Sequence, residues 1–123
     1  MITQNNRKIT MLPNERNVIY ISGPITGVED WESIFMAAEK ELKCIANVSA
    51  VVNPCRLVFR VQYRFLGLGN PRYTDYMRED IRGLSTCNYI CMLPGWKHSK
   101  GARIEYRIAK ILNMTILEYI PGN

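Results

Sequence analysis

The chain has 123 residues, of which 47% are apolar and 22% are charged. This length suits one domain of ordinary size with a continuous core, and the composition is that of a folded globular protein. No stretch approaches the ~18 consecutive apolar residues that a membrane span needs, so no spanning helix is expected. The net charge of +5 favours anionic partners, without choosing between a phosphorylated metabolite and a nucleic acid.

The N-terminal residues are polar and lack the apolar centre of a secretory signal. We therefore expect a flexible tail or short docking arm at residues 1–16, and a single domain at residues 17–123. The four cysteines form no CxxC pair, and His98 is the only histidine, so the sequence predicts a reduced interior with no metal. The expected location is the cytoplasm.

Apolar runs that stop at glycine or proline alternate with segments of helical periodicity. Strands are predicted at residues 17–22, 48–53, 88–93 and 114–120, and helices from about residue 30, at 73–87 and at 99–113. This alternation indicates right-handed crossovers and an α/β fold. We predict a three-layer, flavodoxin- or Rossmann-like parallel sheet of four or five strands in the order 2-1-3-4, with helices on both faces.

In such a sheet, ligands bind beyond the carboxyl ends of the strands, at the switch point between the first and third strands. Two loops follow these strands, at Gly23-Pro24 and at Pro94-Gly95. The stretch Cys55–Arg72 holds four arginines and no acidic residue, and is predicted to be a long functional loop. Its interleaved aromatic residues are typical of a lid or an interface, and less often of a surface that stacks nucleic-acid bases.

Glu105 falls within the apolar arc of the predicted helix at 99–113, whereas the basic residues of this helix cluster on the opposite side. A buried carboxylate is costly unless it is paired, hydrogen-bonded or turned toward a polar cleft. Two interpretations stay open from position alone: a structural ion pair at the sheet edge, and a functional carboxylate.

Asp80 lies beside the apolar stripe of the preceding helix, whereas Asp75 and Glu79 are expected to be more solvated. A single aspartate in such a position is more often a surface charge. However, a pair of carboxylates on either side of one cleft, such as Asp80 and Glu105, is what chemistry at a glycosidic carbon requires. Ser99 stands at the expected N-cap of the helix that carries Glu105. Capping alone explains a serine there, and a cap is compatible with an anion site at the free helix amides.

Three motifs occur in order along the chain: Tyr20-Ile-Ser-Gly-Pro-Ile-Thr-Gly27, the segment from Tyr76-Met-Arg-Glu-Asp80 to Asn88, and the segment from Met92-Leu-Pro-Gly-Trp96 through Ser99 to Glu105. Together, over roughly residues 17–120, they resemble the nucleoside 2-deoxyribosyltransferase-like superfamily. Within it, the closest resemblance is to an uncharacterised domain family of phages and prophages, which implies that the cytoplasm in question is that of a bacterium or of a phage-infected host.

The resemblance implies an enzyme that breaks or exchanges the N-glycosidic bond of a deoxynucleoside or its 5′-monophosphate, with no cofactor. It implies that Glu105 is the nucleophile at C1′, that Asp80 assists the departing base, and that Tyr20 orients the nucleophile. The substrate-binding residues are expected in the loops and the first turn of the following helix: Ser22, Gly23, Pro24, Ile25, Thr26, Gly27, Gly95, Trp96, Ser99, Gly101 and Ala102.

The residue at the position of Ser99 differs between two branches of that superfamily. The transferases carry an aspartate at this position, whereas the related monophosphate N-glycosidases carry a serine. A carboxylate would repel a 5′-phosphate, which a hydroxyl and helix amides attract, so a nucleoside 5′-monophosphate is the expected substrate. Three features depart from the family pattern: Asn88 in place of an aspartate, Thr26 in place of an arginine, and the arginine-rich stretch at Cys55–Arg72.

The predicted function is therefore that of a nucleotide N-glycosidase or deoxyribosyltransferase-like enzyme. The alternative is a non-catalytic nucleotide-binding phage accessory protein that senses or sequesters its ligand. We expect a homodimer or larger homo-oligomer in which the Cys55–Arg72 stretch covers the neighbour's pocket. Neither a nucleic acid nor a membrane is expected as a partner.

Overall fold

A computed structural model describes residues 1–121 of the chain, so the last two residues of the predicted domain, 122 and 123, lie outside the described residues. The strands are β1 (Ile2–Gln4), β2 (Arg7–Lys8), β3 (Val18–Ser22), β4 (Ala50–Val52), β5 (Tyr89–Met92) and β6 (Thr115–Tyr119). The helices are α1 (Trp31–Lys43), α2 (Pro54–Arg64), α3 (Tyr73–Leu84) and α4 (Lys100–Ile111), with a short 3-10 turn η1 (Trp96–His98) before α4. None of the helices within residues 1–121 combines the length and apolar character needed to cross a membrane.

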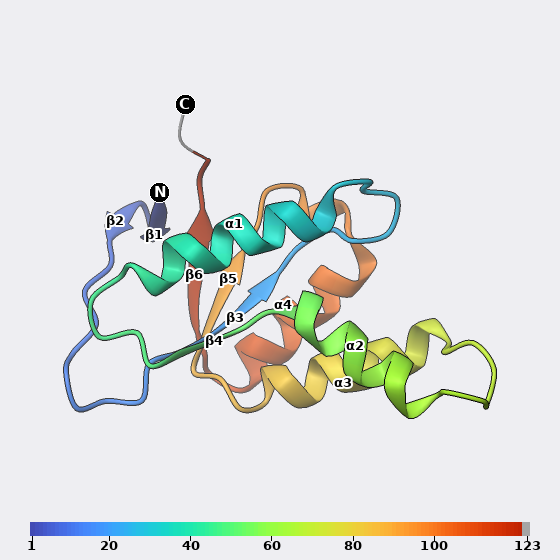
Figure 1. Ribbon diagram of the computed structural model, residues 1–123. Coiled ribbons are helices and arrows are strands. Elements are labelled where there is room, and N and C mark those ends of the chain that lie inside the picture. The colour runs from blue at the N-terminus through green and yellow to red at the C-terminus, as the bar shows by residue number, and fades with distance from the viewer. Residues whose placement is uncertain (122–123) are drawn as a thin grey trace.

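The strands form one sheet in the order β2-β1-β6-β5-β3-β4 (Figure 1). The four strands β4, β3, β5 and β6 run parallel, and their order is the predicted 2-1-3-4. The predicted three-layer α/β fold is thus confirmed. The sheet has six strands, however, because the N-terminal residues add two antiparallel strands to the expected set.

The N-terminal segment is a β-hairpin, so the flexible tail predicted for residues 1–16 is not what the structure shows for residues 2–8. β1 pairs antiparallel with both β2 and the edge strand β6. Asn5 and Asn6 both adopt the positive φ that a tight hairpin turn requires. Ile2 is buried in the core, and this burial together with the strand pairing holds the hairpin on the sheet.

The two faces of the sheet are covered by different helices, because side chains alternate along β3. Ile19 and Ile21 point to one face, where they pack with α1. Tyr20 lies on the other face, among residues of α3 and α4. This second face carries the functional residues considered below.

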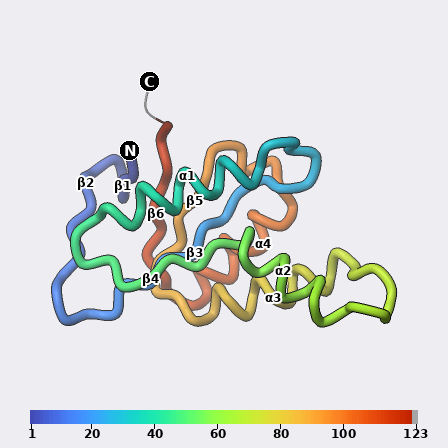
Figure 2. Tube along the Cα trace, in the orientation of Figure 1, coloured from blue at the N-terminus to red at the C-terminus, as the bar shows by residue number. Residues whose placement is uncertain are grey.

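More than half of the stretch Cys55–Arg72 is helical, and the predicted long loop is wrong for residues 55–64, which belong to α2. The helix begins with Pro54 at its first position, after an Asn53 side chain that accepts a hydrogen bond from the Cys55 amide. Figure 2 shows α2 and α3 extending together beyond the sheet.

Arginines four residues apart on α2 hold this helix against its neighbours. Arg56 binds Glu39 of α1 through two hydrogen bonds, of 2.7 and 3.0 Å. Arg64 donates to Glu79 of α3 at 3.2 Å, and Arg60 lies within 3.8 Å of the same carboxylate. Glu79 is buried rather than solvated as predicted, because these arginines cover it.

Candidate active site

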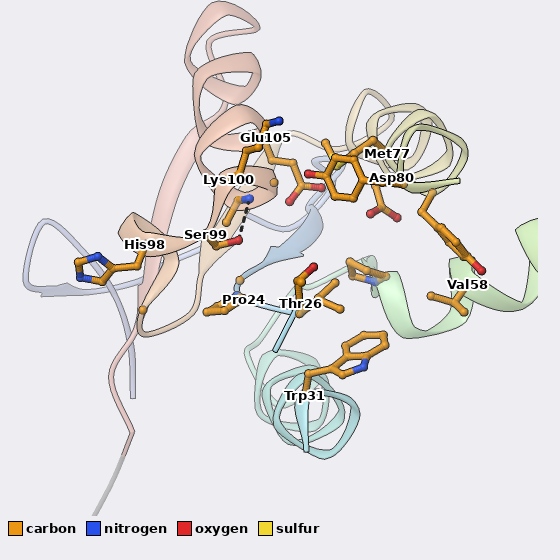
Figure 3. A pocket seen from close by; sticks show the side chains of 18 residues that line it. Pro24, Thr26, Trp31, Val58, Met77, Asp80, His98, Ser99, Lys100 and Glu105 are labelled. Carbon is orange, nitrogen blue, oxygen red and sulfur yellow. Dashed lines mark hydrogen bonds between the residues drawn. The ribbon is translucent and has the colours of Figure 1, made fainter. Parts of the chain in front are cut away.

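A cavity of ≈ 750 Å³ opens above the carboxyl ends of β3 and β5, at the switch point that the strand order predicts. The loops after these two strands, the first turns of α4, and the faces of α1, α2 and α3 surround it (Figure 3). The residues that line it are Gly23, Pro24, Ile25, Thr26, Trp31, Pro54, Val58, Tyr73, Tyr76, Met77, Asp80, Gly95, His98, Ser99, Lys100, Gly101, Ala102 and Glu105.

Glu105 reaches into the cavity from α4, with only 5% of its surface exposed. The Tyr20 hydroxyl donates a hydrogen bond to Oε2 of Glu105, and the Ser22 hydroxyl donates one to Oε1 at 2.8 Å. Burial raises the pKa of Glu105 to about 7, although both hydrogen bonds oppose this rise. None of the ion pairs within residues 1–121 includes Glu105, which excludes the structural ion pair at the sheet edge.

Both donors come from β3, and their spacing explains why they meet one carboxylate. Tyr20 and Ser22 are two residues apart, so their side chains point to the same face of the sheet. That face is the one α4 covers. Complete burial, followed by the charges of Glu105 and Asp80, raises the pKa of Tyr20 well above its ordinary value. Its hydroxyl therefore keeps its proton and acts as a donor.

Asp80 enters the cavity from α3, and Figure 3 shows its side chain and that of Glu105 directed into the same space. The pKa of Asp80 is raised to about 8. Burial is the largest cause, followed by the negative charge of Glu105 and then that of Glu79. Two hydroxyls favour the ionised form of Glu105, whereas every influence on Asp80 favours its protonated form. Near neutral pH, the pair therefore favours an ionised Glu105 beside a protonated Asp80.

The two ends of the cavity differ in chemistry. At one end, Ser99 caps α4, and its hydroxyl oxygen accepts a hydrogen bond from the Ala102 amide at 3.3 Å. The remaining amides of the first turn have no partner within the helix, and His98 and Lys100 line the same end. Such a helix terminus attracts anions. At the other end, Figure 3 shows two apolar side chains, Trp31 and Val58.

Gly23 is required by close packing between the two loops that form the cavity floor. A Cβ at this position would lie 2.8 Å from the Cβ of Leu93, which immediately follows β5. Gly95 has a φ of +84°, in the left-handed region that favours glycine, and a Cβ there would lie 3.3 Å from Pro24. The two loops therefore approach each other only because both positions are glycines.

Comparison with protein-family models gives one match, to "Domain of unknown function (DUF4406)", over residues 17–118. The chain belongs to the DUF4406 family. The match covers β3 to β5, all of β6 except Tyr119, and all residues that line the cavity. No curated protein and no solved structure matches the chain.

The structure of this DUF4406 chain brings most of the predicted site residues together around the cavity. Those that line it are Glu105, Asp80, Gly23, Pro24, Ile25, Thr26, Gly95, Ser99, Gly101 and Ala102. Tyr20 and Ser22 lie behind Glu105, and Ser22, predicted to bind substrate, instead binds that carboxylate. Gly27 and Trp96 do not line the cavity. Trp96 packs on Tyr106 of α4, with ring centroids 4.6 Å apart.

Several lining residues were not predicted. Tyr73, Tyr76 and Met77 precede Asp80 by seven, four and three residues, so one face of α3 supplies all four side chains. This helical spacing could have indicated from the sequence that these side chains share the face of Asp80. Pro54 and Val58 were missed because α2 was predicted to be a loop, and Trp31 was not among the predicted site residues.

Two of the three departures from the resemblance now have a structural explanation. Asn88 lies at the amino end of β5, far along the strand from the cavity, where its Oδ1 accepts a hydrogen bond from the Val18 amide at 2.8 Å. Its amide group also donates to the Arg16 carbonyl, which an aspartate cannot do. The arginines of α2 bind Glu39 and Glu79, as described above. Thr26 does line the cavity, with nothing in the structure that explains the threonine.

Within residues 1–121, no group of three or more His, Cys, Asp or Glu side chains is arranged so that it could hold a metal ion.

Proposed function

We propose that this protein cleaves the N-glycosidic bond of a nucleoside 5′-monophosphate, through a covalent intermediate on Glu105. The observation that carries this proposal is the Glu105 carboxylate, buried in the cavity and bound by the Tyr20 and Ser22 hydroxyls. A buried carboxylate with no cationic partner is costly to the fold, and nucleophilic chemistry is a function that such a group serves. The motif resemblance supports the same assignment.

In the first step, an ionised Glu105 oxygen forms a bond to C1′ while the bond from C1′ to the base nitrogen breaks. The bonding electron pair leaves with the base, and protonated Asp80 transfers its proton to it. The raised pKa of Asp80, about 8, supports its role as the acid, and the hydrogen bonds on Glu105 support its role as the nucleophile.

In the second step, water attacks C1′, the ester to Glu105 breaks, and ionised Asp80 takes a proton from the water. This restores both carboxyl groups and yields the sugar phosphate. A second free base can replace water: its nitrogen attacks C1′, its proton passes to Asp80, and the base is exchanged. The same cavity thus supports a hydrolase or a transferase.

The two ends of the cavity support a nucleotide as the substrate. The N-terminus of α4, with Ser99, His98 and Lys100, suits a 5′-phosphate. The apolar end, with Trp31 and Val58, suits the flat face of a base. The sugar then lies between the two ends, with C1′ beside Glu105.

A homodimer is part of the proposal, with the tip of α2 and α3 placed over the neighbour's cavity. Four large apolar side chains are exposed around this tip: Phe59, Tyr63, Leu66 and Leu68. The exposed Arg60 and Arg64 lie beside them, and the start of α1, next to the cavity, exposes Glu29, Asp30 and Glu32. The opposite charges of these two surfaces support a contact between copies. Light scattering that finds a monomer with full activity would contradict it.

A reducing, cytoplasmic location is also proposed. All four cysteines are free thiols, and three of them are buried. Disulfides are rare in the cytosol and common in secreted domains, so free thiols support this location.

The proposal is tested by assaying the purified protein for free base released from nucleosides and from their 5′-monophosphates. Glu105→Gln should bind the best substrate with an affinity close to that of the wild type, but release base more slowly by several orders of magnitude. Glu118→Gln, which alters an exposed glutamate of β6, is the matched control and should keep full activity. Tight nucleotide binding with no base release by the wild type would favour the non-catalytic binding protein instead.

A further inference from the structure

Tyr73, the first residue of α3, reaches across the cavity toward α4. A Cβ placed on Gly101 would lie 3.1 Å from the Tyr73 hydroxyl oxygen and 3.5 Å from the Met77 sulfur. The hydroxyl therefore lies close over the first turn of α4. An alanine at position 101 would have to push it away by a few tenths of an ångström.

The charges of the two carboxyl groups in the cavity act on the same hydroxyl. Burial raises the pKa of Tyr73, and the charges of Glu105 and Asp80 raise it further, so the hydroxyl keeps its proton. Tyr20 and Ser22 approach Glu105 from behind, through β3. Tyr73, by contrast, lines the cavity and is 48% exposed, so its hydroxyl is accessible to a ligand.

This position lies between the two parts of the cavity to which the proposed function assigns the phosphate and the reacting carbon. Gly101 belongs to the helix terminus that suits the phosphate, and Glu105 attacks C1′. The part of a nucleotide that joins its phosphate to C1′ is the sugar ring. We propose that the Tyr73 hydroxyl binds a hydroxyl group of the nucleotide's sugar and thereby holds C1′ against Glu105, an inference that rests on the proposed function.

The experiment compares three sugars with the same base. Nucleoside 5′-monophosphates carrying ribose, 2′-deoxyribose and 2′,3′-dideoxyribose are assayed with the wild type and with Tyr73→Phe, which keeps the ring and removes the hydroxyl. For whichever hydroxylated nucleotide reacts best, Tyr73→Phe should lower kcat/KM about tenfold, as expected for one lost hydrogen bond. For the dideoxy analogue, which has no sugar hydroxyl, the loss should be less than twofold. An equal loss on all three sugars, or no loss on any, would overturn the proposal.

Tyr106→Phe is the control, since the Tyr106 ring packs against Trp96 and does not line the cavity. It should change kcat/KM less than twofold, with no dependence on the sugar. Tyr76→Phe, at a second tyrosine that lines the cavity, is assayed as well. A sugar-dependent loss of kcat/KM in Tyr76→Phe and none in Tyr73→Phe would assign the contact to Tyr76 and overturn the proposal.

Gly101→Ala tests the geometric part of the proposal. In the wild-type background it should displace the Tyr73 hydroxyl and reproduce the sugar-dependent loss of Tyr73→Phe. In the Tyr73→Phe background the obstructing oxygen is absent, so Gly101→Ala should lower kcat/KM by a smaller factor than it does in the wild type. An equal loss in both backgrounds would mean that Gly101 serves the ligand or the backbone directly, and would contradict the role given to Tyr73.

Binding measurements distinguish a failure of this inference from a failure of the proposed function. If the nucleotides bind but no base is released, the same comparisons are made with dissociation constants measured by calorimetry. The predicted sugar-dependent loss of affinity in Tyr73→Phe would then support the contact while the proposed function fails. A wild-type protein that neither binds nor cleaves any of these nucleotides would overturn both.

Discussion

The Tyr20 hydroxyl of β3 donates a hydrogen bond to the Glu105 carboxylate of α4, across 85 residues of sequence. This contact stabilises the ionised form of Glu105. Replacing Tyr20 with phenylalanine keeps the buried ring and removes only the donor. The pKa of Glu105 should then rise above about 7, and the carboxylate should lose its fixed orientation.

We predict that Tyr20→Phe lowers kcat/KM on the order of tenfold to a hundredfold and moves the acid limb of the pH–rate profile to higher pH. Tyr89→Phe is the control, because the Tyr89 hydroxyl contacts Asn17 at 3.4 Å and does not line the cavity. A Tyr20→Phe enzyme with slower turnover but an unshifted acid limb would show that the hydroxyl does not act through the ionisation of Glu105.

The carboxyl pair predicts a bell-shaped pH profile. Turnover requires an ionised Glu105, so it should fall as pH drops below about 7. It also requires a protonated Asp80, so it should fall as pH rises above about 8. Asp80→Asn should be slower and should lose the alkaline limb, because the asparagine does not titrate. Base release measured from pH 5 to 10 would contradict the assignment if the variant kept the wild-type alkaline limb.

The phosphate end of the cavity gives a charge-reversal test at Ser99. A charge-assisted contact is worth roughly 1.5–3 kcal/mol, so a 5′-monophosphate should exceed its nucleoside in kcat/KM about tenfold or more. Ser99→Asp should erase or invert this preference, while the nucleoside loses much less. Ser99→Ala, which removes the cap without adding charge, should keep the preference for the monophosphate. Equal wild-type values for the two substrates would mean that Ser99 is only a helix cap.

The buried Glu79 gives a test of how the α2 wall of the cavity is held. Glu79→Gln leaves Arg60, Arg64 and Arg82 without their shared carboxylate. These arginines are more than half exposed, so water screens the interaction, and we expect a loss of roughly 1–2 kcal/mol in the free energy of unfolding. Denaturant unfolding measures it, with Glu118→Gln as the exposed control. Identical stabilities of the two variants would mean that the arginines do not clamp α2.

Much of this fold could be predicted from the sequence, because the four parallel strands are apolar runs that end at glycine, proline or asparagine. Glu105 was found by the same physics, as a carboxylate inside an apolar helical arc. The helix was predicted to extend to residue 113, however, and near this end its apolar side chains are not buried: Ile111 is 81% exposed and Leu112 is 49% exposed. Periodicity indicates which face a helix buries, but not where along the helix the burial stops.

The errors have physical reasons as well. β2 is short and basic, so composition made the hairpin look like a tail, although Asn5-Asn6 is a favourable pair for its tight turn. The arginine-rich stretch was predicted to be a functional loop because the partners of its arginines, Glu39 and Glu79, are distant in sequence. Ser22 was assigned to substrate because its contact with Glu105 depends on how α4 packs against β3.

The central claim is that Glu105 forms a covalent bond to the sugar, and trapping that bond tests it most directly. A 2′-fluoro nucleotide is suitable, because fluorine beside C1′ destabilises positive charge there and slows both the formation and the breakdown of the intermediate. Intact-mass spectrometry of the wild type should show the added mass of one sugar phosphate, with the label on the peptide that contains Glu105 and none on Glu105→Gln. Base release without any label on Glu105, or a label on another residue, would contradict the account.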